Sequence, residues 1–137
     1  MSDKPGLPNE DRRKYKRAAD VFIVTYRLQS PFEVNLTVGP REYAAVAMDI
    51  GEGGMGMDVS QAIPVGTPVR LKFKIVNEVA ASERNRQHVF SLAGESRYCQ
   101  LMGEKSHRVG VIFKDVSAEE SVFIATYVKD QALRKYA

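Results

Sequence analysis

Residues 12–17 are basic except for Tyr15, and among them Arg13 and Arg17 form an R-x-x-x-R pattern with Arg12 just ahead. Arginine is planar and permanently charged, so it bonds phosphate through paired donors and stacks on flat rings. The segment therefore indicates an anion-binding site, although a charge run of this kind can equally be a solvated surface.

A second cluster with chemical potential lies in the glycine-rich residues 49–56. An aspartate such as Asp49 can accept hydrogen bonds from N–H donors of a ligand. Gly51, Gly53 and Gly54 let the backbone approach a ligand closely and point N–H groups at an anion. The alternative is an ordinary β-turn, which Asp49 initiates and in which glycine tolerates a positive φ.

Other side chains carry weaker chemical signals. Tyr98 offers a stacking surface for a base, with Arg97 beside it, but an ordinary strand aromatic facing core or solvent is the commoner case. His88 and His107 have no carboxylate or cysteine at metal-ligand spacing, and the only cysteine is Cys99. No catalytic triad, P-loop or paired-carboxylate motif stands out. The sequence therefore predicts neither an enzyme nor a metal site.

The elements that must position these residues are mainly short strands. Apolar and basic residues alternate most cleanly over residues 69–75, which predicts a strand with one buried and one wet face. Ser117 and Glu120 form a capping box ahead of apolar residues at helical spacing, which predicts a helix over residues 117–135. The other predicted strands are residues 21–26, 42–49, 55–59, 89–99 and 108–113, with a short alternating stretch at 32–36 between two turn signals. This order predicts an antiparallel barrel with a helix packed against it.

Composition limits the class of protein. A length of 137 residues fits one domain, and we expect residues 12–137 to form it behind a flexible Pro- and Gly-containing tail over residues 1–11. Hydrophobic and charged fractions of 44% and 27% are those of a soluble globule, and a net charge of +3 is low for a generic nucleic-acid binder. There is no apolar run long enough for a membrane span and no signal peptide, so the sequence predicts a cytoplasmic protein.

The two motifs, in this order and on this strand pattern, resemble the PilZ domain family. The family pattern is R-x-x-x-R in an N-terminal segment, then D/N-x-S-x-x-G after an early strand. Arg13 and Arg17 match the first motif, and Asp49 and Gly54 match the ends of the second. The resemblance covers roughly residues 10–137. It implies a six-stranded antiparallel β-barrel of the split type with a C-terminal helix, and it implies binding of cyclic di-GMP, a bacterial second messenger.

Gly51 departs from the family pattern, which usually has serine at that position. Glycine removes the hydroxyl that helps to hold the ligand but leaves the backbone N–H. A lost neutral hydrogen bond is worth about 1 kcal/mol net, or several-fold in affinity, so we expect weakened rather than abolished binding. The ligand-binding residues that the resemblance and the residue chemistry suggest are Arg12, Arg13, Arg17, Asp49, Gly51, Gly53, Gly54 and Tyr98.

The resemblance implies a cyclic di-GMP receptor or adaptor that signals through a protein partner in motility, biofilm or polysaccharide control. With almost no residues outside the domain, we expect no fused output module and a monomer or homodimer. One alternative is a degenerate family member that does not bind the nucleotide and acts through protein contacts. Another is a barrel that binds single-stranded nucleic acid, but such barrels display several aromatic residues along a basic groove, and aromatics are only 9% of this chain.

Residues 12–17 adjoin the Pro- and Gly-containing tail, so we expect this segment to be mobile without ligand and to fold over cyclic di-GMP, which stabilises only the ordered state. Backbone NMR relaxation of residues 8–18, measured with and without the nucleotide, should show restricted motion on binding. Unchanged order parameters in the saturated protein would contradict this expectation.

Overall fold

The computed structural model of the chain describes residues 17–29, 41–83 and 86–135. The predicted stretch at 32–36 and the predicted tail over residues 1–11 lie outside the described residues. The described residues form six strands and one helix: β1 (Arg17–Leu28), β2 (Glu42–Gly51), β3 (Gly54–Val59), β4 (Pro68–Val76), β5 (Gln87–Gly103), β6 (Ser106–Phe113) and α2 (Ala118–Lys135). The predicted class, mainly β with a C-terminal helix, is confirmed.

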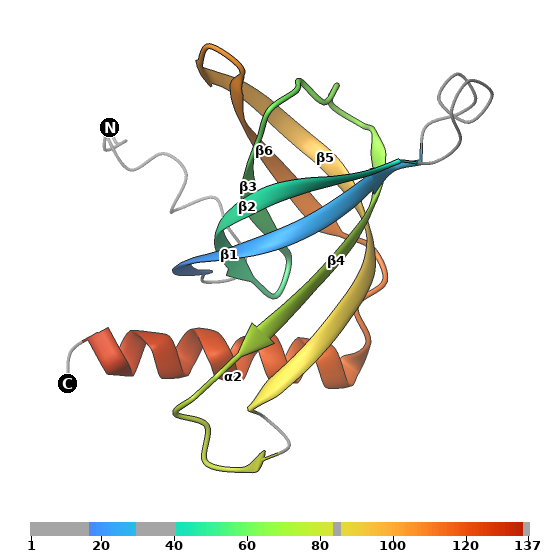
Figure 1. The fold of residues 1–137 in the computed structure, drawn as a ribbon. Helices are drawn as coiled ribbons and strands as arrows, with labels where there is room; N and C mark the ends of the chain where they lie inside the picture. Colours follow the sequence, from blue (N-terminus) through green and yellow to red (C-terminus); the bar gives the residue numbers. More distant parts are fainter. Residues whose placement is uncertain (1–16, 30–40, 84–85, 136–137) are drawn as a thin grey trace, which may run out of the picture.

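The six strands form one antiparallel sheet that closes into a ring in the order β1-β2-β3-β6-β5-β4. The closing contact is short, because β1 pairs with β4 only between residues 24–28 and 69–73. The β4–β5 pairing is longer and joins residues 68–76 to 87–95. The strands therefore spread apart at one end, and α2 lies across that end of the ring, against β1 and β2 (Figure 1).

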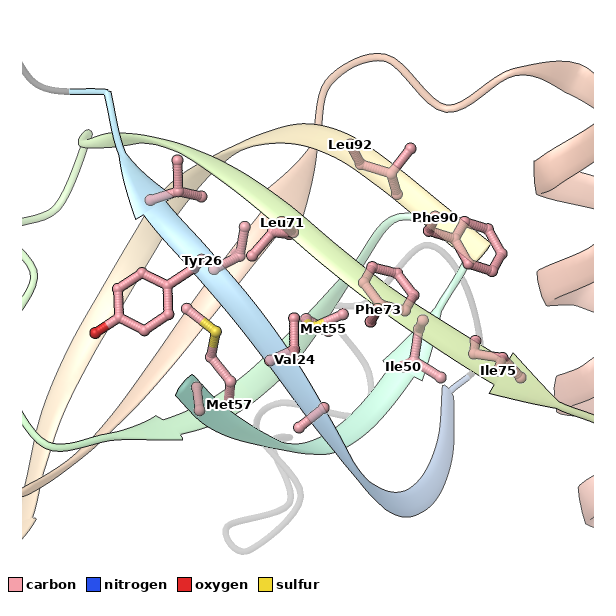
Figure 2. Packing of buried hydrophobic residues seen from close by; sticks show 14 of the residues in the cluster. Val24, Tyr26, Ile50, Met55, Met57, Leu71, Phe73, Ile75, Phe90 and Leu92 are labelled. Carbon is pink, nitrogen blue, oxygen red and sulfur yellow. The ribbon is translucent and has the colours of Figure 1, made fainter. Parts of the chain in front are cut away.

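The core fills the space inside the ring. In β4, Val69, Leu71, Phe73 and Ile75 are buried while the residues between them point outward, as the alternation in the sequence predicts. Aromatic packing continues across the strands, with the rings of Phe73 and Phe90 stacked at 4.7 Å between centroids. Figure 2 shows these side chains converging with buried residues of β1, β2 and β3, namely Val24, Tyr26, Ile50, Met55 and Met57.

The helix is held by its cap, by polar contacts along its length and by an apolar face. The N–H of Glu120 donates to Oγ of Ser117 at 3.0 Å, and the Glu120 carboxylate accepts from the N–H of Ser117 at 3.3 Å, so the predicted capping box forms. The other Glu120 oxygen lies 3.0 Å from Nε2 of His88, and further along, Asn77 donates to Asp130 at 2.9 Å. The buried side chains of the helix are Phe123, Ile124 and Tyr127.

Gly54, at the start of β3, allows that strand to approach β6 closely. It pairs with Ile112, and an added Cβ would lie 2.1 Å from the carbonyl oxygen of Val111, which is closer than any real contact of this kind. Positive φ does not explain glycine here, because among the described glycines a positive φ occurs at Gly66, outside residues 51–56. Gly54 is therefore needed for backbone-to-backbone contact.

Replacing Gly54 with alanine should destabilise the fold, because a Cβ would force β3 and β6 apart. We expect a loss of roughly 2 kcal/mol, which lowers Tm by about 6–10 °C in a domain of this size. Gly103→Ala is the matched control, since a Cβ at Gly103 meets no atom within 4 Å. Thermal unfolding followed by circular dichroism measures both variants, and equal Tm values would contradict the close-approach argument.

Candidate functional site

Four residues form a row across the outer face of the ring. Asp49, Gly56, Gly110 and Tyr98 lie opposite one another on the adjacent strands β2, β3, β6 and β5. A Cβ added at Gly56 would lie 3.2 Å from Oδ2 of Asp49, and one added at Gly110 would lie 2.1 Å from Cε2 of Tyr98. The carboxylate and the ring thus lean over Gly56 and Gly110, which we call the glycine floor. The glycine floor is therefore buried beneath these two functional groups, which lie close to the backbone of the outer face.

Arg17 joins this row from β1. Its Nη1 donates to Oδ1 of Asp49 at 2.8 Å, and the N–H of Gly56 donates to the same oxygen at 3.1 Å. The two side chains are 16% and 22% exposed, so the ion pair is less screened than one on an open surface. The structure thus brings the second arginine of the R-x-x-x-R pattern to the aspartate of the second motif, while Arg12 and Arg13 lie outside the described residues.

The glycines of the second motif form the end of the β2–β3 hairpin. Gly51 pairs with Gly54 across the turn and with Arg17 on β1, and both glycines are buried. The carbonyl of Gly53 accepts a hydrogen bond from the N–H of Phe113 at 2.9 Å. These glycines close the turn between β2 and β3, so the β-turn that the sequence analysis gave as an alternative is present. The turn lies directly beside Arg17 and Asp49.

The same turn also touches the helix. Oγ of Ser121, in the first turns of α2, donates to Oε2 of Glu52 at 2.8 Å. Glu52 lies between Gly51 and Gly53, so the motif loop and the helix share a direct polar contact. A shift of the loop is therefore resisted by the position of α2.

Tyr98 points outward, with 41% of the residue exposed. Of the two placements expected for an ordinary strand aromatic, core or solvent, Tyr98 has the solvent-facing one, and its ring lies against the floor at Gly110. Arg97 is exposed at an irregularity in the β5–β6 pairing between Ser96 and Tyr98. One surface of the tyrosine ring thus packs on backbone while the residue keeps contact with solvent.

Sequence reasoning missed two charged residues beside the floor. Arg108 on β6 and Asp58 on β3 are paired across the strands, with Nε and Nη2 of Arg108 both donating to the Asp58 carboxylate. Hydrogen bonding to Asp58 raises the pKa of Arg108 above its ordinary value, against a lowering by burial, and nearby Tyr98 and Asp49 raise it further. Their spacing in the sequence could have revealed them. Asp58 and Arg108 each stand two positions from a floor glycine, and residues two apart in a strand point to the same face.

Within residues 17–29, 41–83 and 86–135 there is no group of three His, Cys, Asp or Glu side chains that could hold a metal ion. The one described helix is too polar to cross a bilayer. His88 contacts Glu120 and the rings of Phe90 and Phe123, and thus helps to hold α2.

Comparisons with known proteins agree with this fold. The family model of the PilZ domain matches residues 11–130. MotI/DgrA, the inhibitor of motility of Bacillus subtilis, superposes with a TM-score of 0.66 at 16% identity over 92% of this chain and 54% of that chain. The PilZ domain with c-di-GMP of YcgR from Escherichia coli gives 0.55 at 17% identity over 91% and 97%. The MrkH–c-di-GMP complex of K. pneumoniae gives 0.53 at 11% identity over 91% and 54%.

The chain spans about half the length of the MotI/DgrA and MrkH chains and nearly all of the YcgR domain. No curated protein matches the sequence significantly. The family model nevertheless covers most of the 137 residues, and the ring of strands with its helix agrees with solved PilZ domains. The chain belongs to the PilZ domain family.

Proposed function

We propose that the chain is a receptor for cyclic di-GMP, which binds on the outer face around the glycine floor. The observation that carries the proposal is the contact between Arg17 and Asp49, the motif arginine and motif aspartate, beside Gly56. Two structural neighbours, the YcgR domain and MrkH, were solved with c-di-GMP, which supports the same ligand here. The role is that of a binding module, without a catalytic step.

The residues of the outer face suit the two kinds of group in this ligand. Arg17 uses one terminal nitrogen on Asp49 and keeps other N–H donors for a phosphate, to which charge-assisted hydrogen bonds are strong. Asp49 is oriented by two donors on Oδ1, and its Oδ2 can accept from the N1–H or amine of a guanine. Arg12 and Arg13 add positive charge from the preceding sequence. Tyr98 offers an aromatic surface for stacking.

The contact between the motif loop and α2 suggests how binding is passed on. A nucleotide that pulls on Arg17 or on the loop at Gly51 acts on Glu52, which holds Ser121 of the helix. We expect a protein partner to read that change, as in motility, biofilm or polysaccharide control. Because the ligand is an intracellular messenger, this function places the protein in the bacterial cytoplasm.

The second candidate function is a degenerate module that acts only through protein contacts. Gly51 favours it, because the ligand-holding hydroxyl of the family is missing there. The Asp49 oxygen that Arg17 and Gly56 share is also already satisfied within the chain. Binding of single-stranded nucleic acid is less well supported, because Tyr98 is the exposed aromatic side chain of the described residues and stacking along a strand needs several.

Calorimetric titration with cyclic di-GMP should show saturable binding by the parent chain. Arg17→Ala should weaken binding at least about tenfold, because a hydrogen bond to a charged group is worth roughly 1.5–3 kcal/mol. Arg13→Ala should have a similar effect. Gly51→Ser should tighten binding several-fold by restoring one hydroxyl.

Arg86→Ala is the matched control, since Arg86 is an exposed arginine in the loop between β4 and β5. It should leave the affinity unchanged. Thermal unfolding of every variant separates lost binding from lost folding. No heat with the parent chain refutes the receptor role, and binding by Gly51→Ser alone would favour the degenerate module.

A further inference from the structure

The pairing of Arg108 with Asp58 leaves a specific set of donors free. Asp58 accepts from Nε and Nη2, the side of the guanidinium, and both side chains are partly exposed at 27% and 33%. Guanidinium has five N–H donors in a fixed fork. The side-on pair therefore leaves the end of the fork, formed by Nη1 and the second hydrogen of Nη2, for another acceptor.

Arg108 stands next to an aromatic platform. Tyr98 pairs with Gly110, and Arg108 is two residues before Gly110 on the same outward face of β6, so the two side chains are diagonal neighbours. The ring of Tyr98 occupies the space that a side chain at position 110 would need, and the residue is 41% exposed. A flat base stacked on the exposed side of this ring would therefore lie beside the strand position of Arg108, on the same outward face.

We propose that Arg108 is a specificity-determining residue that reads the O6 and N7 edge of a guanine stacked on Tyr98. This inference rests on the proposed function and deepens it. Two acceptors side by side match the free end of the guanidinium fork. Adenine places its N6 amine where guanine has O6, and a donor facing a donor is unfavourable. The site would therefore select a guanine nucleotide over the corresponding adenine nucleotide.

Asp58 is the positioning residue for this contact. Its two hydrogen bonds fix the plane and direction of the guanidinium, so that little side-chain freedom is lost when the base binds. Lysine at position 108 would keep the charge but could not form the fork. The role assigned to Arg108 is thus separable from that of a generic positive charge, and it is distinct from the contact that Asp49 could make with N1–H and the amine.

The test measures affinities of the full chain for three nucleotides: cyclic di-GMP, cyclic di-AMP and cyclic di-IMP. Cyclic di-IMP keeps O6 and N7 but lacks the exocyclic amine. We expect Arg108→Lys to lower the affinities for cyclic di-GMP and cyclic di-IMP by about tenfold, because a bidentate contact discriminates between bases by roughly that factor. The affinity for cyclic di-AMP should be unchanged. The matched control is Arg70→Lys, since Arg70 also pairs with an aspartate, Asp115, but lies on β4 outside the floor row.

Two further variants support the assignment. Tyr98→Phe keeps the aromatic ring and should leave the affinity for all three nucleotides unchanged. Tyr98→Leu removes the stacking surface and should lower the affinity for all three. Asp58→Asn should lower the ratio of guanine to adenine affinity by releasing the guanidinium, and it replaces Arg108→Lys if that variant does not fold by circular dichroism.

Each remaining outcome is decisive. An unchanged guanine-to-adenine ratio in Arg108→Lys, or equal loss of all three nucleotides, overturns the assignment of Arg108 while the receptor role stands. Loss of cyclic di-GMP binding without loss of cyclic di-IMP binding also overturns it, because the residue would then not read O6 and N7. No binding of any nucleotide by the parent chain refutes the proposed function, and the inference with it.

Discussion

The Asp49 carboxylate holds three strands together at one point of the outer face. It projects from β2, accepts Nη1 of Arg17 from β1, and accepts the N–H of Gly56 from β3. Removing this carboxylate would leave a partly buried guanidinium and a backbone N–H without their shared acceptor, which is costly away from water. The same contact leaves little room at position 56, because a Cβ there would lie 3.2 Å from Oδ2 and the carboxylate would have to shift by a few tenths of an ångström. A small residue at position 56 therefore suits the way in which the charged pair is held.

Strand β3 shows how the core and the outer face are encoded by the same six residues. In the order Gly-Met-Gly-Met, Met55 and Met57 are fully buried, while Gly54 and Gly56 lie in rows with Gly51 and Asp49. Side chains alternate between the two faces of a strand, so a register slip by one residue would put methionines on the outer face and glycines in the core. A slipped register is disfavoured because it would lose this core burial. The burial of the methionines therefore also fixes the positions of the glycines in the candidate site.

Local signals in the sequence were sufficient for most elements but not for their contacts. Alternation over residues 69–75 and the capping box at Ser117 are short-range patterns, and both predicted their elements correctly. β1 begins at Arg17, before the apolar stretch at 21–26, because pairing with β2 extends the strand where its own side chains give no strand signal. Asp58 and Arg108 are 50 residues apart, so their pairing depends on the register of β3 against β6. Such a contact follows from topology, which no local pattern contains.

The two arginines that lie beside the Asp49–Gly56–Gly110–Tyr98 row, Arg17 and Arg108, are each paired with an aspartate. Arg17 is paired with Asp49 and Arg108 with Asp58, so the two described arginines bring little net positive potential to the floor. A doubly charged anion gains from such a surface mainly through directed hydrogen bonds, since long-range attraction needs uncompensated charge. The basic excess in residues 12–16 is then what can supply attraction, because that segment contains no acidic residue. In the proposed receptor the two parts of the arginine motif would have separable physical tasks: the earlier residues would concentrate the anion, and Arg17, held by Asp49, would give it a direction. For the proposed receptor we expect removal of the charges in residues 12–16 to abolish most of the salt dependence of binding and Arg17→Ala to change it little, because Arg17 forms a shielded pair with Asp49.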